Sequence, residues 1–179
     1  MPPSYPPPLR PATPADAARL ADLGRRTFLD TFVEGFAIPY PPQDLAHYLE
    51  EAFAEARVAD RLADPAERWW VGERDGRLAG FAQAGPCALP HPEATPANGE
   101  LKRLYIDRQA QGLGFGRALL EQALAWLDEA FTGPQWIGVW SGNLKAQRLY
   151  ARYGFEKAGE YDYPVGAWRD REFILRRYR

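Results

Sequence analysis

The stretch between residues 100 and 120 constrains the fold most, because it joins three recognisable elements. Apolar residues at 101–106 predict a short strand, and Gly112, Gly114 and Gly116 predict a turn after it. A helix should follow, since apolar residues recur at helical spacing at Ala118, Leu119, Leu120, Ala123, Leu124, Leu127 and Phe131. Glycines let a charged ligand approach the backbone, and a helix start presents N–H groups to it. The pattern predicts a phosphate or pyrophosphate site.

The spacing of the glycines distinguishes between three kinds of phosphate loop. A P-loop ends in Gly-Lys-Ser/Thr, but Gly116 is followed by Arg117 and Ala118. A dinucleotide fingerprint requires G-x-G-x-x-G and an acid about 20 residues later, and both are missing here. The pattern that remains is Q-x-x-G-x-G, formed by Gln111, Gly112, Leu113, Gly114, Phe115 and Gly116. A glycine-rich turn without a ligand is the alternative interpretation.

Composition limits the classes of protein and partner. The 179 residues fit one domain, which would bury roughly 70% of its unfolded surface. A net charge of −2 argues against nucleic acid, and the chain has no run of 18 apolar residues that could span a membrane. The proline-rich start lacks the apolar region of a signal peptide, and the single cysteine, Cys87, excludes an internal disulfide. We therefore expect a cytoplasmic protein, and the two isolated histidines predict no metal site.

The remaining sequence predicts helices and strands on both sides of this stretch. Thr13 and Pro14 are typical of a helix start, and Asp75 and Gly76 are typical of a tight hairpin. We expect an edge strand near 8–11, a helix to about residue 32, one or two helices at 43–62, hairpin strands at 69–73 and 78–84, a loop at 85–99, a strand at 136–140 parallel to 101–106, a helix at 143–153, and strands at 155–161 and 172–176.

A second motif lies between residues 143 and 155, N-L-K-A-Q-R-L-Y-A-R-Y-G-F. Ala146, Leu149, Tyr150 and Tyr153 fall on one face of a predicted helix, and the glycine after Tyr153 is a typical C-cap. Taken alone, Tyr150 would be interpreted as a core residue and Asn143 as an N-cap.

Together, the two motifs resemble those of the GCN5-related N-acetyltransferase (GNAT) family, which binds acetyl-coenzyme A. The second motif matches the pattern N-x-x-A-x-x-x-Y-x-x-x-G-F at all five positions: Asn143, Ala146, Tyr150, Gly154 and Phe155. The resemblance implies an α/β (α+β) fold, with a mixed central sheet of about 6–7 strands, a splayed central parallel pair and helices on both faces. We expect a single domain over residues 1–179, with a loose proline-rich lead at 1–8.

The resemblance also implies roles for particular residues. The main chain of Leu104, Tyr105 and Ile106 would pair with the pantetheine arm and polarise the thioester carbonyl. Asn143 would bond the same arm, and Tyr150 would lie beside the sulfur. Backbone N–H groups would hold the pyrophosphate along Gln111, Gly112, Leu113, Gly114, Phe115, Gly116 and Arg117.

The reaction implied by the family requires an acid and a base. A phenol suits the leaving thiolate, because its pKa of about 10 exceeds the thiol's value of about 8.5, so Tyr150 is the predicted general acid. An ammonium must lose a proton before it attacks, and Glu100 matches in position the catalytic glutamate of histone-acetylating relatives. The alternative is a strand-end charge paired with Lys102 or Arg103. Cys87 has no basic neighbour in the sequence, so we expect direct transfer in a ternary complex rather than an acyl-cysteine.

The sequence leaves the identity of the acceptor amine open. Residues 27–32, 44–49 and 136–140 resemble bacterial spermidine/spermine-type polyamine N-acetyltransferases, although the proline-rich loop at 38–42 and Ser141-Gly142 depart from them. Carboxylates in the first helices could attract a polycation, or could form an ordinary solvated face: Asp30, Glu34, Asp44, Glu50 and Glu51. A protein N-terminus or lysine is the rival acceptor, and an acetyl-CoA-binding regulatory module without turnover is the non-enzymatic alternative. The sequence does not indicate an oligomeric state, but members of the family often dimerise, so a homodimer is one possible partner state.

Overall fold

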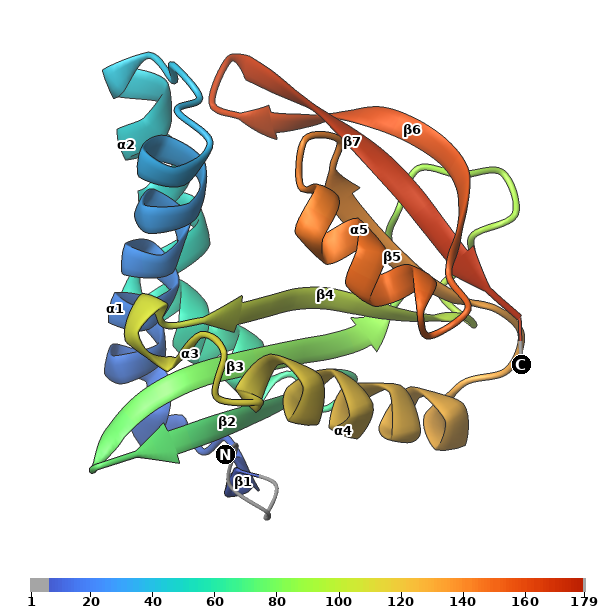
Figure 1. Cartoon of the computed structure of the whole chain (residues 1–179), viewed down its shortest axis with the longest axis horizontal. Coiled ribbons are helices and arrows are strands. Elements are labelled where there is room, and N and C mark those ends of the chain that lie inside the picture. Colours follow the sequence, from blue (N-terminus) through green and yellow to red (C-terminus); the bar gives the residue numbers. More distant parts are fainter. Residues whose placement is uncertain (1–6, 179) are drawn as a thin grey trace.

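The computed structural model describes residues 7–178, so most of the predicted proline-rich lead lies outside the described residues. Within them, strands form a seven-stranded mixed sheet in the order β1-β2-β3-β4-β5-β7-β6 (Figure 1). The strands are β1 Leu9–Pro11, β2 Arg68–Arg74, β3 Arg77–Pro86, β4 Gly99–Ile106, β5 Gln135–Trp140, β6 Glu156–Val165 and β7 Trp168–Arg177. The predicted fold class is therefore confirmed.

The N-terminal part of the sheet is antiparallel and follows the predicted hairpin. β2 and β3 are joined at Asp75 and Gly76, which both have positive φ angles, of 51° and 75°. β3 also pairs with β4, and a bulge between Gln83 and Ala84 leaves Lys102 outside the register. Such a bulge changes which face the side chains of β4 point to. Glu100 and Leu104 therefore come to lie on opposite faces of the sheet.

The parallel pair at the centre is short, and its strands then diverge. β4 and β5 pair only from Gly99 with Gln135 to Leu101 with Ile137. Beyond that point β4 remains paired with β3 alone, whereas β5 pairs with β7 along its whole length. The two strands separate in the manner predicted from the family resemblance, and Figure 1 shows β4 and β5 diverging from their paired ends. One main-chain edge of residues 102–106 consequently faces the opening and not a neighbouring strand.

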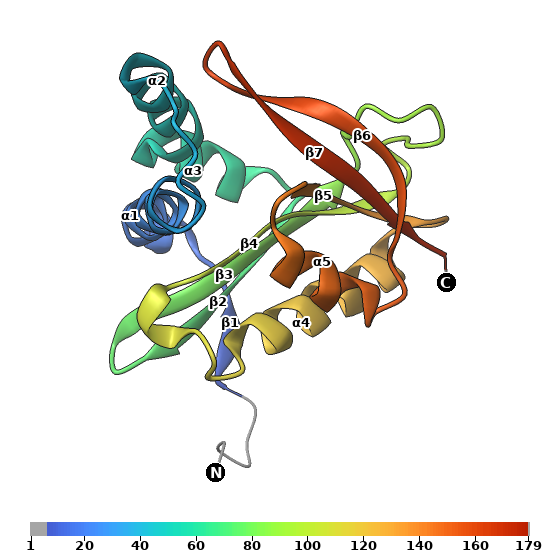
Figure 2. The ribbon, with the colours of Figure 1, turned by 45° about the horizontal axis from the view of Figure 1, so that its top comes forward.

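Helices cover both faces of the sheet, as the amphipathic patterns require. α1 (Ala17–Phe28), α2 (Pro42–Phe53) and α3 (Glu55–Ala63) lie on one face, and α4 (Phe115–Ala130) and α5 (Leu144–Ala151) on the other (Figure 2). α4 buries Leu119, Leu120 and Leu127 completely in the core formed with β3, β4 and β5. The predicted helical region at 43–62 is two helices, because Ala54 has an extended conformation.

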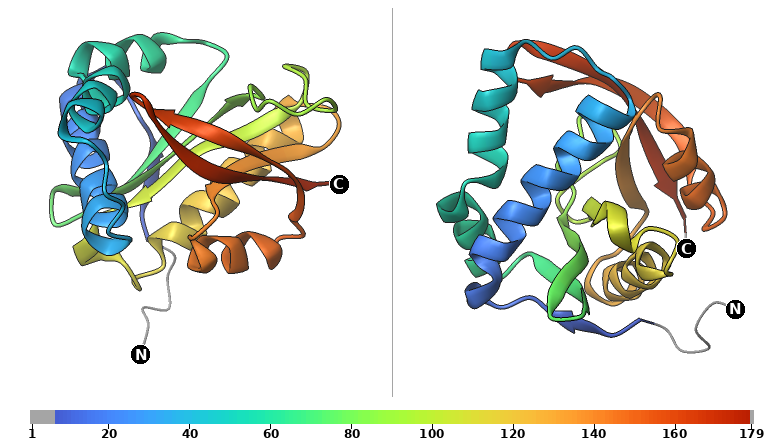
Figure 3. Two further views of the ribbon diagram at one scale, coloured as in Figure 1. Left: turned by 90° about the horizontal axis from the view of Figure 1, so that it is seen from above. Right: turned by 60° about the vertical axis from the view of Figure 1, so that its left-hand side comes forward.

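The start of the first helix agrees with the prediction, whereas its end has a conformation that the sequence did not predict. The predicted start is confirmed: Thr13 caps a turn of 3₁₀ helix, and the Asp16 side chain accepts a hydrogen bond from the Thr13 N–H at 2.8 Å. At the other end, α1 continues as a π-helix from Leu29 to Gly35. π-Helical segments are rare and often occur at functional sites. Here the segment lies beside the opening between β4 and β5, as the right-hand view of Figure 3 shows.

The last two strands are longer than predicted, at ten residues each. They form a hairpin that turns at Gly166, whose φ is +60°. The prediction stopped short because charged and aromatic residues alternate here without a continuous apolar run. Asp44 at the start of α2 accepts a hydrogen bond from the Ala167 N–H at 2.7 Å. This contact joins the hairpin to the helical layer and closes one side of the central opening.

Candidate active site

The glycine loop has the backbone that its sequence predicts. Gly112 and Gly114 have φ angles of +80° and +89°, a region that residues with a Cβ atom rarely adopt. Gly114 is the N-cap of α4, and the first intrahelical hydrogen bond of α4 runs from Ala118 N–H to Gly114 C=O at 3.0 Å. The N–H groups at the start of α4 therefore precede the helical hydrogen bonds and remain available to an anion.

A groove of about 690 Å³ runs from this loop toward the opening between β4 and β5. We name it the glycine-loop groove, and it is lined by the π-helix, the end of β4, the loop and α5: Thr27, Asp30, Phe32, Leu104, Tyr105, Ile106, Gln111, Gly112, Gly114, Gly116, Arg117, Asn143, Ala146, Leu149 and Tyr150 among others. Two of the predicted loop residues, Leu113 and Phe115, do not line the groove. Leu113 packs against a small cluster in which the Phe115 side chain is buried with Ala79 and Ala110, so Phe115 turns its side chain into the core. Only its backbone could contact a ligand.

A second cavity, of about 180 Å³, lies on the other side of the opening. We name it the splay cavity, and its walls combine aromatic rings with charged groups: Phe28, Phe32, Tyr48, Glu100, Lys102, Arg103, Tyr105, Trp140, Tyr150, Tyr161, Tyr163, Asp170 and Glu172. The groove and the cavity share six lining residues: Phe32, Leu104, Tyr105, Asn143, Ala146 and Tyr150. A ligand in one would therefore meet a ligand in the other beside these residues.

Tyr150 lies on α5 at the junction of the two spaces. The residue is only 7% exposed, and its ring packs edge-on against Phe155 with centroids 6.3 Å apart. Burial raises the pKa of the hydroxyl above its usual range, so the phenol stays protonated near neutral pH. Tyr150 lines both spaces, so a ligand in either of them could contact its side chain.

Asn143 is both the predicted N-cap and a wall of the groove. Its Oδ1 accepts a hydrogen bond from Ala146 N–H at 3.0 Å, which begins α5. The Nδ2 group is therefore the part of this side chain that can donate to a ligand. Gly142 allows the preceding turn, because a Cβ atom there would lie 2.3 Å from the Trp140 ring.

Glu100 lines the splay cavity and is 8% exposed. Its Oε2 accepts a hydrogen bond from Ala88 N–H at 2.8 Å and lies 3.4 Å from Lys102 Nζ. Of the two cations in the alternative interpretation, Lys102 is the partner, whereas Arg103 donates to Gln83 at 2.9 Å. The carboxylate thus lines the cavity, but its Oε2 atom already has two donors.

Glu172 on β7 is a second carboxylate in the splay cavity, and the sequence prediction missed it. Tyr161 on β6 stands opposite it and donates a hydrogen bond to Oε2 at 2.9 Å. Burial raises the pKa of the Glu172 carboxyl to about 7, the Tyr161 hydrogen bond opposes this, and the charges of Asp170 and Glu100 add to it. The sequence offered one signal, because residues 170, 172 and 174 alternate along a strand and so share one face. Only the pairing of β7 with β5 shows which face that is.

The carboxylates proposed from the sequence to attract a polycation lie elsewhere. Glu34 pairs with Arg108 at 3.3 Å, Glu50 with Arg25 at 3.6 Å and Glu51 with Arg57 at 3.3 Å. Asp44 holds the β6–β7 turn, and Asp30 lines the glycine-loop groove. None of the five lines the splay cavity, whose acids are Glu100, Asp170 and Glu172.

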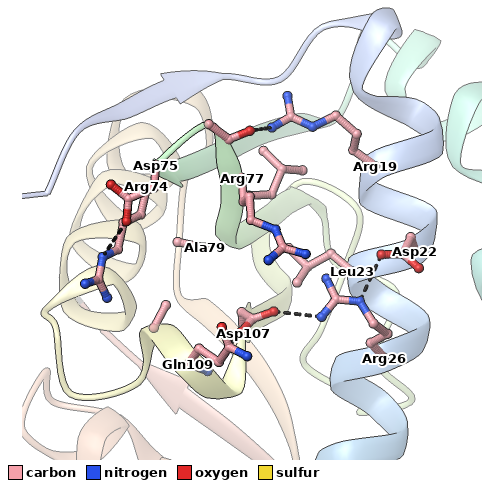
Figure 4. A pocket seen from close by; sticks show the side chains of 13 residues that line it. Arg19, Asp22, Leu23, Arg26, Arg74, Asp75, Arg77, Ala79, Asp107 and Gln109 are labelled. Carbon is pink, nitrogen blue, oxygen red and sulfur yellow. Dashed lines mark hydrogen bonds and ion pairs between the residues drawn. The ribbon is translucent and has the colours of Figure 1, made fainter.

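Two other features carry no chemistry that these spaces require. Burial raises the pKa of the Cys87 thiol to about 11, so little thiolate is present at neutral pH. A third hollow of about 520 Å³ lies between α1 and the β2–β3 hairpin (Figure 4). Several of its charged side chains pair with one another, as Arg26 does with Asp22 and Asp107 at 2.9 and 2.8 Å. It shares no residue with the groove or the cavity.

Thr27 is another groove residue that sequence reasoning missed. It lies on α1, is 6% exposed, and its hydroxyl has no hydrogen-bond partner within residues 7–178. A buried hydroxyl without a partner is costly, so such a group in a groove wall fits a site that binds a polar ligand. Among these residues there is also no helix long and apolar enough to cross a membrane, and no group of three or more side chains suited to a metal ion.

Comparison with known proteins shows which family this chain resembles in sequence and in fold. The profile of the acetyltransferase (GNAT) family matches residues 28–155. An uncharacterized N-acetyltransferase of Lactobacillus delbrueckii subsp. lactis is 28% identical over 162 residues, which cover 90% of this chain and 91% of that protein. The spermine/spermidine N(1)-acetyltransferase of Bacillus subtilis is 34% identical over 92 residues, covering 50% of this chain and 59% of that protein. The crystal structure of PaiA N-acetyltransferase from Thermoplasma acidophilum with coenzyme A has the same fold, with a TM-score of 0.73 at 16% identity and coverage of 96% and 98%.

Proposed function

Because this chain belongs to the GNAT family of acetyltransferases, we propose that it transfers the acetyl group of acetyl-CoA to a primary amine of a small molecule. Attack would be direct, in a complex that holds both substrates. The observation that carries the proposal is the meeting of the glycine-loop groove and the splay cavity at Tyr150. A thioester in the groove and an amine in the cavity would meet beside a protonated phenol.

The groove fits a long ligand with an anionic centre. The loop provides glycine backbone and helical N–H groups for the pyrophosphate, at residues 111–117. The unpaired edge of β4 at Leu104, Tyr105 and Ile106 can form main-chain hydrogen bonds with the amides of an extended pantetheine arm. Asn143 Nδ2 and the Thr27 hydroxyl add side-chain groups along the same path.

Direct attack is favoured because the chain offers a proton donor but no suitable acyl carrier. Tyr150 would give a proton to the departing thiolate, whose ordinary pKa of about 8.5 lies well below that of the buried phenol. Glu100 is the base proposed from the sequence, and its carboxylate lies in the cavity that would hold the amine. Cys87 is buried with Trp136 and Ile174, and its raised pKa makes an acyl-cysteine unfavourable.

A polyamine is the acceptor that we propose within this class. Acidic groups and aromatic rings together suit an ammonium ion, through charge and through cation–π contacts, and both line the splay cavity. The similarity to the Bacillus subtilis enzyme covers half of this chain and supports the same acceptor. A protein N-terminus or lysine is the rival, because a single amine at the end of a peptide could enter the same cavity.

The deciding experiment measures thiol release from acetyl-CoA with spermidine, spermine, amino acids and N-terminal peptides as acceptors. Saturable turnover with the polyamines alone is the expected result. Turnover with peptides alone would replace the polyamine by a protein acceptor. Acetyl-CoA binding by calorimetry without turnover of any amine would refute the enzymatic proposal and favour a regulatory acetyl-CoA-binding module.

A further inference from the structure

We propose that Glu172, and not Glu100, is the group that accepts the proton of the attacking ammonium. This inference rests on the proposed function, since it assigns a residue of the same acetyl transfer. Glu172 reaches the splay cavity from β7, the strand next to β5, on the side of the opening where the acceptor would lie. A direct proton transfer needs a carboxylate oxygen within hydrogen-bond reach of the amine, and a lining residue of the cavity can provide this.

The oxygens of the two carboxylates differ in how they are occupied. Glu100 Oε2 has the Ala88 N–H and the Lys102 ammonium as donors. Glu172 Oε2 accepts one hydrogen bond, from the Tyr161 hydroxyl, and within residues 7–178 Glu172 has no ion pair. A carboxylate without a paired cation keeps more of its capacity to take up a proton. Glu172 is therefore better placed to act as the base.

The strand beside Glu172 leaves room for a substrate. A Cβ atom at Gly138 of β5 would lie 3.1 Å from Glu172 Oε2 and 3.1 Å from the Tyr161 hydroxyl. Glycine at this position therefore lets the Glu172 carboxylate and the Tyr161 hydroxyl lie close to the backbone of β5, and Gly138 itself lines the cavity. Tyr161 in turn fixes the orientation of the carboxylate, because it lies directly opposite Glu172 in the β6–β7 register.

The proton-accepting range of Glu172 agrees with this role. Burial raises the pKa of the carboxyl to about 7, so it is ionised above this pH and protonated below it. The titratable and charged groups that share the cavity with Glu172 come from several elements: Tyr48, Glu100, Lys102, Arg103, Tyr105, Tyr150, Tyr161, Tyr163 and Asp170. Tyr40 belongs to the same polar network, because its hydroxyl donates a hydrogen bond to Asp170.

The reaction then balances in protons and bonds. Glu172 takes one proton from the ammonium, and the free electron pair of nitrogen forms the C–N bond to the thioester carbon. The C–S bond breaks, the sulfur takes the Tyr150 proton, and the second nitrogen proton returns to the phenolate through water. The proton on Glu172 passes to solvent when the amide leaves. The products are the N-acetyl amine, the free thiol of coenzyme A and one proton.

The test compares pH profiles of kcat/KM for the acceptor in wild type, Glu172→Gln and Glu100→Gln. Wild type should lose activity as the pH falls below about 7. Glu172→Gln should lose this inflection and 10²- to 10⁴-fold of its activity at pH 7, the usual range for a positioned base. Glu100→Gln should keep the inflection. If Glu100→Gln removes it and Glu172→Gln keeps it, the assignment is wrong.

Two further measurements separate a base from a residue that only supports the structure. Tyr161→Phe removes the hydrogen bond that lowers the pKa of Glu172, so the inflection should move to higher pH. The penalty of Glu172→Gln should also shrink with an acceptor amine that is already unprotonated at pH 7. An equal loss with both amines, or an inflection that Tyr161→Phe does not move, overturns the inference.

The same variants distinguish a wrong role for Glu172 from a wrong proposed function. Acetyl-CoA affinity, measured by calorimetry, should not change in Glu172→Gln, because Glu172 does not line the glycine-loop groove. Wild-type turnover combined with full activity of Glu172→Gln refutes the role of Glu172 alone. Wild type that acetylates no amine refutes both.

Discussion

Replacement of Gly112 by alanine should weaken acetyl-CoA binding far more than it weakens the fold. Gly112 has a φ of +80°, and a Cβ atom there would have no protein atom within 4 Å. The cost to the fold is therefore the left-handed backbone alone, about 1–2 kcal/mol. For a chain of this size, that lowers the Tm by roughly 2–8 °C. The added methyl group would lie where the pyrophosphate has to approach the backbone.

The expected loss of binding follows from the hydrogen bonds at stake. A hydrogen bond to a charged group contributes about 1.5–3 kcal/mol. Loss of one such bond to a phosphate oxygen would raise the Kd for acetyl-CoA roughly 10- to 150-fold. Calorimetry at constant salt measures this value, and thermal unfolding monitored by circular dichroism measures the cost to the fold.

Gly76 provides a matched control for the same substitution. It has a φ of +75°, and a Cβ atom there also has no neighbour within 4 Å, but it lies at the β2–β3 turn, away from the groove. Gly76→Ala should lower the Tm by a similar amount and leave the Kd unchanged. Equal Kd values for the two variants would refute the assignment of the loop to the pyrophosphate.

Three further predictions test the acid, the packing and one ion pair. Tyr150→Phe should lower kcat by 10²- to 10⁴-fold with little change in the Kd for acetyl-CoA, and a loss of less than tenfold in thiol release would contradict its role as the acid. Leu127→Ala should destabilise the fold by about 3–5 kcal/mol in urea titrations, because Leu127 is fully buried against Gly99, and a loss below 1 kcal/mol would contradict tight packing. The Arg10 hydrogen bond, opposed by burial, lowers the pKa of Asp16 from 3.8 to about 2, so its stabilisation is complete above pH 4 and is lost as the pH falls through 2. Asp16→Asn should thus cost about 2 kcal/mol at pH 7, and the difference from wild type should narrow between pH 4 and 2.

The sequence alone was sufficient for the central strand, the glycine loop and the two helices beside it. These elements depend on local features that can be recognised in the sequence. Glycines stand at 112 and 114, where the structure has positive φ angles, Asn143 is a typical N-cap, and apolar residues recur at helical spacing in α4. The parallel pair followed from the connecting helix, and the splay followed from the family resemblance. The motif residues Asn143 and Tyr150 were predicted to face one ligand, and both line the groove.

Only the tertiary structure decided which carboxylates line the splay cavity. The acids of the N-terminal helical region were predicted to attract a polycation, but three of them form ion pairs with arginines. Glu34 pairs with Arg108, Glu50 with Arg25 of α1, and Glu51 with Arg57 of α3. Glu172 became a cavity residue because β7 pairs with β5 in one particular register. A shift of that register by one residue would turn its side chain to the opposite face. Local patterns therefore predicted residues that line the glycine-loop groove, whereas long-range strand pairing and burial determined which carboxylates line the splay cavity.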